Sequence, residues 1–176
     1  MTELTEKDGF QLDIRYATTN NFTEEQIYKT GRCFLHNQMA ARIKKANEFF
    51  KDKGYGIKLF DCYRPRPAQL RLWNAFPDPN YVGSPLNGSF HNRGCAVDLS
   101  LYETSTGKEV DMGTEFDYFG QKGWSDYPHL PAQILENRKL LQKGLRSVGL
   151  ETIPREWWHF NFRLPGGAPL QSWEWD

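Results

Sequence analysis

The chain has 176 residues, of which 39% are hydrophobic and 25% are charged, a composition typical of a globular protein with a sizeable core. Its 22 Lys and Arg residues balance 22 Asp and Glu residues, and this zero net charge argues against nucleic acid or an anionic membrane surface as a partner. No apolar run is long enough to span a bilayer. No internal repeat, biased segment or linker divides the chain, so we expect a single domain over residues 1–176.

The N-terminal segment and the cysteines bear on where the protein works. The opening residues, MTELTEKDGF, are polar and of mixed charge, which is not the pattern of a signal peptide. We therefore expect a cytoplasmic protein, with a periplasmic one as the alternative if a signal peptide has been removed. The cysteines, Cys33, Cys62 and Cys95, are odd in number and lack CxxC spacing, so we expect buried free thiols in a reducing compartment.

The first third of the chain predicts a short strand and a long helix. Residues 10–14 alternate apolar and polar side chains, as a half-buried strand does. The polar segment that follows, residues 15–22, is typical of turns, and Thr23 is expected to begin one helical turn. Apolar residues then recur at spacings of three and four over residues 35–53, which predicts a helix that ends before Gly54.

The middle of the chain predicts two strands, a short helix and a long loop. Residues 56–62 form an apolar run that ends at a proline-rich segment, and Pro67 is well placed to begin a short helix. After Gly94 the chain predicts a strand in which Asp98 lies on a small, polar face. Residues 102–130 show little periodicity, and a long irregular segment inside a compact domain is usually functional.

The last third predicts a third helix and a closing hairpin. Pro131 begins a helix with a buried stripe, which Gly149 ends, although Gly144 lies inside it. Residues 150–162 are typical of a strand pair. These elements together predict an α+β fold: a mostly antiparallel sheet with two longer helices and a short one.

Two separate segments carry residues that suit a metal. His91 and Asp98 lie in the first, and Glu156 and His159 lie in the second. A single histidine is more often a solvated or core residue than a ligand, so the prediction depends on the combination. Two imidazoles and one carboxylate suit one Zn²⁺ with a position open to water or substrate, and Glu156 would remain to act as a base on that water.

The spacing of Glu156 and His159 sets a condition on this hypothesis. Residues three apart on an ideal strand face opposite sides. We therefore expect Glu156 to lie in a bend after Pro154, with the strand starting near Trp157 and with His159 and Asn161 on one face.

Arg64 is a further candidate for catalysis. It follows Asp61 at the end of a predicted strand, where a cation would stabilise the oxyanion that forms when water attacks a carbonyl. The alternative is a surface salt bridge between these two residues.

Five motifs in order resemble the zinc D,D-peptidases, and within that group the D-alanyl-D-alanine dipeptidases of the vancomycin-resistance type. The resemblance extends from about Leu12 to Phe162 and is carried by Asp13-x-Arg15-Tyr16-Ala17-Thr18-x-Asn20-Asn21-Phe22, Asp61-x-Tyr63-Arg64-Pro65, Ser89-x-His91-x-x-Gly94-x-Ala96-x-Asp98, Gly113-Thr114-x-Phe116-Asp117 and Glu156-Trp157-Trp158-His159-Phe160.

The resemblance implies a fold like that of the D,D-peptidases and the hedgehog signalling domain, and a role for each matching residue. Zinc would be bound by His91, Asp98 and His159. Glu156 would be the general base and Arg64 would polarise the scissile carbonyl. Substrate contacts would come from Asp117, which receives the free amino group, and from Ser89 and Tyr16.

The implied reaction is zinc-dependent hydrolysis of D-alanyl-D-alanine to two D-alanines, so the expected partner is a small dipeptide, with a homodimer left open. Two alternatives share the metal motif. A zinc D,D-carboxypeptidase would act on peptidoglycan stem peptides and would not need Asp117. A non-catalytic zinc-binding protein of the same fold would not need Glu156 or Arg64.

Overall fold

The computed structural model describes residues 1–175, and its centre is a five-stranded sheet with the strand order β2-β4-β5-β7-β6. The strands are β2 (Gln11–Leu12), β4 (Tyr55–Asp61), β5 (Ala96–Glu103), β6 (Glu151–Ile153) and β7 (Glu156–Asn161). β2 pairs with β4 in parallel, and the remaining neighbours pair antiparallel. The expected α+β fold with a mostly antiparallel sheet is confirmed.

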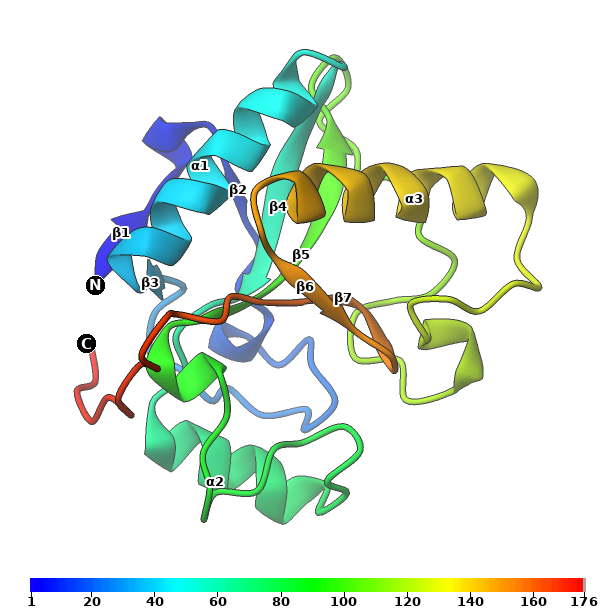
Figure 1. The fold of residues 1–176 in the computed structure, drawn as a ribbon. Coiled ribbons are helices and arrows are strands. Elements are labelled where there is room, and N and C mark those ends of the chain that lie inside the picture. Colours follow the sequence, from blue (N-terminus) through cyan, green and yellow to red (C-terminus); the bar gives the residue numbers. More distant parts are fainter. Residues whose placement is uncertain (176) are drawn as a thin grey trace.

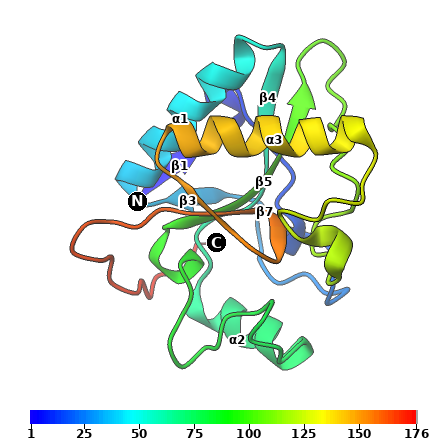
Figure 2. The same cartoon turned by 45° about the vertical axis from the view of Figure 1, so that its right-hand side comes forward.

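The described residues form three α-helices around this sheet. α1 (Asn37–Lys51) and α3 (Ala132–Ser147) lie side by side, whereas α2 (Arg66–Ala75) lies at the opposite end of the molecule (Figures 1 and 2). Gly144 lies where α3 meets α1, because a Cβ atom there would overlap the ring of Phe50. The glycine that weakens the helix pattern is therefore required by helix packing. Short 3₁₀ helices connect these elements: η1 (Glu6–Asp8), η2 (Arg15–Ala17), η3 (His91–Arg93) and η4 (Gln121–Gly123).

A second, two-stranded sheet was not predicted from the sequence. β1 (Thr2–Leu4) pairs antiparallel with β3 (Cys33–Leu35). Strands of three residues are too short to show an alternating pattern. Leu35 belongs to β3, so α1 begins two residues later than the predicted start, where the His36 side chain accepts a hydrogen bond from the backbone of Gln38.

The helical turn predicted at Thr23 is wrong. The backbone at Glu24 is left-handed, with φ of 57°. Asn21 organises this segment instead, because its side-chain nitrogen donates to the carbonyl oxygens of Thr18 and Glu25 at 2.7 and 2.9 Å. Side-chain bonds of this kind compete with a helix for the same backbone groups.

The prediction of three free thiols is also wrong. Cys33 and Cys62 form a disulfide, and Cys95 alone is free and buried. The backbone nitrogen of Tyr63 donates to the carbonyl of Phe34 at 2.8 Å, so β3 lies against the end of β4. That contact places the Cα atoms of the two cysteines 5.3 Å apart, within the range that a disulfide needs. Because two of the three cysteines are not free thiols, the inference of a reducing compartment loses its basis.

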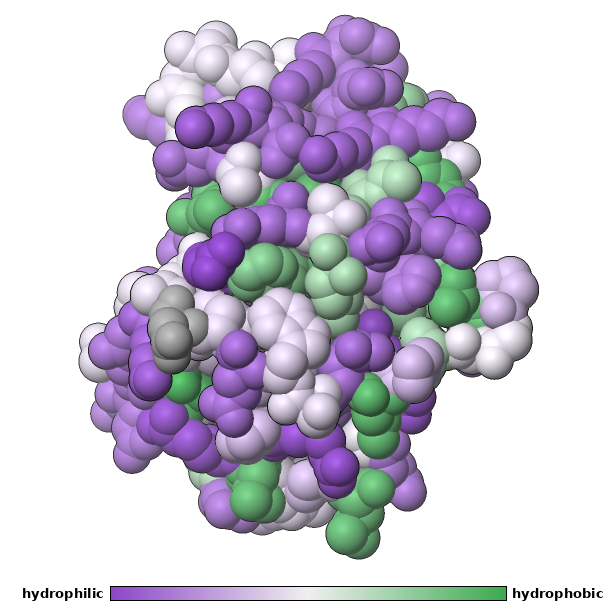
Figure 3. All heavy atoms as spheres, turned by 90° about the vertical axis from the view of Figure 1, so that its left-hand side faces the viewer, coloured by the Kyte–Doolittle hydropathy of each residue, from purple (hydrophilic) through white to green (hydrophobic). Residues whose placement is uncertain are grey.

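The surface agrees with the balanced composition. On the face shown in Figure 3, hydrophilic residues predominate and hydrophobic residues occur in small separate groups. Within residues 1–175, no helix combines the length and the apolar character needed to cross a membrane.

Candidate active site

The sheet brings the two metal-binding segments together. Asp98 on β5 is the direct pairing partner of His159 on β7, and residues that pair directly across strands project from the same face. His91 lies on η3, which leads into β5. One ligand atom from each of these three buried residues lies within 4.8 Å of the others.

The hydrogen bonds of the two histidines indicate that this cluster fits a cation. His91 Nδ1 lies 2.7 Å from the carbonyl oxygen of Cys62, and His159 Nε2 lies 2.8 Å from Oδ1 of Asn161. Because these oxygens only accept, each of these nitrogens carries the proton. The other nitrogens, His91 Nε2 and His159 Nδ1, are then unprotonated and face each other at 3.2 Å.

Asp98 adds a third acceptor to this pair. Its carboxylate oxygens lie 2.9 Å from His159 Nδ1 and 3.3 Å from His91 Nε2. Three acceptors that converge without a proton between them are what a bound metal ion requires.

Glu156 lies beside this cluster, with its carboxylate 3.6 Å from His159 Nδ1. It is the first residue of β7, so the strand starts one residue earlier than predicted. The predicted bend before the strand is therefore wrong. The pairing with β6 instead jumps from Thr152–Phe160 to Ile153–Glu156, and this irregularity within the strand pair accompanies the approach of Glu156 to His159. Burial raises the pKa of Glu156 to about 8, and the charges of Asp98 and Asp117 act in the same direction.

The alternative of a surface salt bridge for Arg64 is wrong, because both partners are buried. Its Nε and Nη2 donate to Asp61 Oδ2 at 2.9 and 2.7 Å, and its Nη1 donates to Gln69 Oε1 at 3.0 Å. The five N–H groups of an arginine therefore leave one on each terminal nitrogen. Arg64 lines the same cavity as the histidines.

The predicted substrate residues Tyr16, Ser89 and Asp117 line this cavity too, which has a volume of about 220 Å³. The Tyr16 hydroxyl donates to Asp117 Oδ2 at 2.9 Å. Burial raises the pKa of Asp117 well above its usual range, and the charge of Asp98 adds to the effect. Pockets for drug-sized ligands start at about 300 Å³, so this cavity suits a smaller molecule.

Aromatic rings from three loops close one side of the cavity. Phe22, Tyr81 and Phe119 line it, and Phe119 stacks on Phe76 with ring centroids 4.8 Å apart. Tyr81 and Phe22 pack against Phe119 at 4.9 and 5.1 Å. These contacts join loops that are distant in sequence into one wall beside Asp117.

Comparison with known proteins places this chain in a family. The profile of the peptidase family M15, described as D-ala-D-ala dipeptidase, matches residues 7–170. The chain belongs to this family. M15 members are metallopeptidases, so the predictions of an enzyme, of a metal and of family resemblance are confirmed.

Relatives from distant bacteria cover most of this M15 chain. A D-alanyl-D-alanine dipeptidase of Escherichia coli (strain K12) is 35% identical over 160 residues, which cover 91% of this chain and 82% of that protein. Proteins of the same description from Enterococcus faecium and Streptomyces coelicolor are 31% and 30% identical, and each alignment covers 88% of this chain and 87% of the relative.

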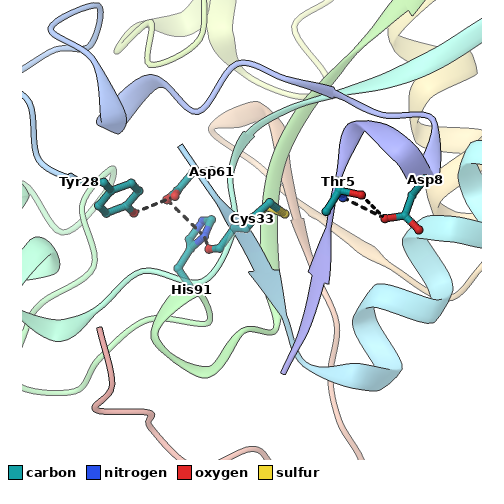
Figure 4. The surroundings of a disulfide bond; sticks show 7 residues. Thr5, Asp8, Tyr28, Cys33, Asp61 and His91 are labelled. Atoms are coloured by element: carbon teal, nitrogen blue, oxygen red, sulfur yellow. Dashed lines mark hydrogen bonds and ion pairs between the residues drawn. A yellow bond between two sulfur atoms is a disulfide. The ribbon is translucent and has the colours of Figure 1, made fainter. Parts of the chain in front are cut away.

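Residues behind the candidate site support it, and sequence reasoning considered Asp61 only as a partner of Arg64. Asp61 accepts a hydrogen bond from the Tyr28 hydroxyl at 2.8 Å and lies 3.6 Å from His91 Nδ1. Figure 4 shows Asp61 between these two side chains, with Cys33 nearby. The sequence pattern did indicate Asn161, because it predicted that Asn161 shares a strand face with His159. No sequence pattern indicated Tyr28 or Gln69, because these residues come to the site from other parts of the chain.

Proposed function

We propose that this protein is a zinc-dependent dipeptidase that hydrolyses D-alanyl-D-alanine to two D-alanines, with one Zn²⁺ per chain. The observation that carries the proposal is the meeting of two groups of residues in one small cavity. A three-acceptor cluster, which fits a metal, lies beside a carboxylate and an arginine, and a second carboxylate, that of Asp117, lines the same cavity.

The metal would be held by His91 Nε2, His159 Nδ1 and the carboxylate of Asp98, because these atoms converge without protons. Two imidazoles and one carboxylate suit zinc and leave a coordination position open. A zinc ion bound there supplies a Lewis acid that acidifies water and polarises a carbonyl.

Glu156 and Arg64 would carry out the steps that belong to the protein. Glu156 takes the proton of the attacking water and passes it to the leaving amine. Arg64 lines the cavity with two N–H groups that Asp61 and Gln69 do not occupy. These groups would stabilise negative charge on the carbonyl oxygen of the scissile bond. Asp61 holds the guanidinium for this role.

Asp117 would select for substrate length. A dipeptide carries a free amino group, which Asp117 would bind as an ion pair with Tyr16 as a second contact, and Ser89 would lie near the substrate. An N-acylated peptide would leave the Asp117 carboxylate buried without a cation, which lowers affinity. This feature favours a dipeptidase over a carboxypeptidase, and the presence of Glu156 and Arg64 favours an enzyme over a binding protein.

The test is amine release by the zinc-loaded protein from D-Ala-D-Ala, N-acetyl-D-Ala-D-Ala and L-Ala-L-Ala. We expect hydrolysis of the free D,D-dipeptide alone. Equal or faster cleavage of the acetylated compound would make the protein a carboxypeptidase. Zinc binding without cleavage of any of the three would make it a binding protein.

A further inference from the structure

Gln69 on α2 is a neutral side chain with only 1% of its surface exposed, and no motif singles it out. Its side-chain oxygen accepts from Arg64 Nη1 at 3.0 Å and from the Ser89 hydroxyl at 3.3 Å. Its side-chain nitrogen donates to the carbonyl oxygen of Gly83 at 2.7 Å. One amide therefore contacts the arginine, a predicted substrate residue and a loop that lines the cavity.

The two edges of the Arg64 guanidinium are held by different elements. Asp61 at the end of β4 holds Nε and Nη2, and Gln69 on α2 holds Nη1. The backbone of Arg64 is held as well, because its nitrogen donates to His91 O and its carbonyl oxygen accepts from Asn92. The guanidinium also lies over the Tyr16 ring, 5.2 Å from its centroid. Gln69 supplies the hydrogen bond that holds the terminal nitrogen which Asp61 does not hold.

Such a turn would change the site. Arg64 Nη2 already lies 3.8 Å from Asp98 Oδ2, one of the three atoms that fit a metal. A guanidinium freed at Nη1 would leave a buried donor without a partner, and this cost drives it toward another acceptor. Any movement toward Asp98, which lines the same cavity, would pair a free N–H group with this carboxylate and withdraw it from a substrate carbonyl.

We propose that Gln69 is the positioning residue for Arg64: it fixes the arginine for charge stabilisation and couples it to the Gly83 loop beside the substrate. The proposal rests on the function proposed above only for its effect on rate. The orientation of Arg64 is a separate property that can be measured without turnover.

The rate experiment uses Gln69→Met, which keeps the length of the side chain and removes the amide. We expect kcat for D-Ala-D-Ala to fall about tenfold to a hundredfold, less than the loss of a whole oxyanion donor, with KM and zinc content near wild type. The matched control is Asn74→Leu, which removes an exposed amide from the same helix and should leave kcat unchanged.

A double-mutant cycle separates positioning from a general structural effect. Measured in an Arg64→Lys background, Gln69→Met should change kcat by less than about twofold, because the residue it positions is absent. An equal loss of kcat in both backgrounds, or no loss in the single variant, would overturn the proposal.

The orientation experiment follows hydrogen exchange of the Arg64 Nε–H group by ¹H–¹⁵N NMR, with the signal assigned by its absence in Arg64→Lys. Exchange should accelerate about tenfold in Gln69→Met and stay unchanged in Asn74→Leu. Gln69→Glu keeps the acceptor oxygen and should retain slow exchange, which also provides a test if the Met variant does not fold.

Unchanged exchange in Gln69→Met, or equally fast exchange in Gln69→Glu, would overturn the proposal. If the wild-type protein cleaves no dipeptide, the proposed function fails, whereas the exchange experiment still decides whether Gln69 positions Arg64.

Discussion

Single hydrogen bonds behind the metal-binding atoms determine which atoms of the site carry protons. The carbonyl of Cys62 and the amide oxygen of Asn161 each take the proton of one histidine. The opposite nitrogens are thereby left free for a metal, an arrangement that also fixes the orientation of each ring. The proposed metal binding would thus depend on residues outside the proposed ligand set.

Asn161→Leu tests this dependence. The substitution removes the acceptor for His159 Nε2 and should weaken zinc binding about 10- to 100-fold, as is typical when such a partner is lost. Zinc affinity would be measured by competition with a chromogenic chelator. Asn74→Leu, a change of an exposed amide on α2, serves as the control, and equal affinities in the two variants would contradict the prediction.

Glu156→Gln separates metal binding from proton transfer. The zinc content should stay at one per chain, because Glu156 is not among the three ligand residues. The rate of D-Ala-D-Ala hydrolysis should fall by about 10²- to 10⁴-fold, the usual contribution of a general base. His159→Ala is the opposite case and should lose the metal; full zinc content in that variant would disprove the ligand set.

Elements of secondary structure hold the loops that border the cavity. Arg138 on α3 is 3% exposed and donates to the carbonyl oxygens of Met112, Lys122 and Trp124 at 2.7 to 2.8 Å. Burial lowers the pKa of its guanidinium to about 10. These bonds clamp both ends of the loop that carries Asp117, whose backbone is left-handed with φ of 59°. A helix outside the site thus helps to fix where Asp117, the proposed amine contact, lies.

Arg138→Met should loosen that loop. Three carbonyl oxygens would lose their donor, so we expect unfolding in urea to show a loss of about 2 to 4 kcal/mol. KM for the free dipeptide should rise as well, with zinc affinity unchanged. Lys139→Met, at an exposed neighbouring position, is the control. A loss of stability with an unchanged KM would mean that Arg138 supports the fold alone.

Asp8 links η1 to α1 and makes the stability of this corner dependent on pH. Its carboxylate accepts from Lys44 at 2.6 Å and from the backbone of Thr5 at 3.0 Å, and the bond from Lys44 contributes most to lowering its pKa from 3.8 to about 2. A carboxyl group whose pKa is lowered by folding stabilises the fold fully at pH values above the pKa that it has in the unfolded chain. This stabilisation is lost as the pH falls through the pKa that the group has in the folded protein.

The melting temperatures of wild type and Asp8→Asn should therefore differ near neutral pH. The difference should decline below about pH 4 and vanish near pH 2, which calorimetry across this range would measure. Asp126→Asn, at an exposed position, should show no such trend. A constant difference down to pH 2 would mean that the charge of Asp8 is not what stabilises the corner.

At the scale of the whole molecule, the disulfide between Cys33 and Cys62 cross-links the two sheets. The disulfide connects the small β1–β3 sheet to the end of β4 across a sequence separation of 29 residues. The same segment of β4 leads into Arg64, and the carbonyl of Cys62 bonds to His91. The bond thus unites the minor sheet with the part of the central sheet that supports the site.

Removal of the disulfide by the double change Cys33→Ser and Cys62→Ser should lower stability by about 3 to 4 kcal/mol, the entropy effect of a closed loop of this length. For a domain of this size that corresponds to about 6 to 16 °C in Tm. Cys95→Ala is the control. Alkylation of the unfolded protein without reductant should label one thiol per chain, and three labelled thiols would show that the disulfide does not form.

The sequence by itself indicated the helices, the main strands and the candidate residues for the site. Helix periodicity reflects burial of one face, so α1 and α3 could be predicted without knowledge of the elements against which they pack. The two segments proposed to bind a metal could be recognised because each contains its candidate residues within a short stretch of sequence. The roles of Glu156, Arg64 and Asp117 stay predictions that the experiments above address.

Tertiary structure alone decided the disulfide, the β1–β3 pair and the supports of the site. The physical reason is that these features depend on contacts between residues far apart in the chain, which no local pattern records. Gln69 illustrates it: on its own helix it is an ordinary amide. It becomes a contact of Arg64 only because α2 packs against the end of β4 and beside the Gly83 loop.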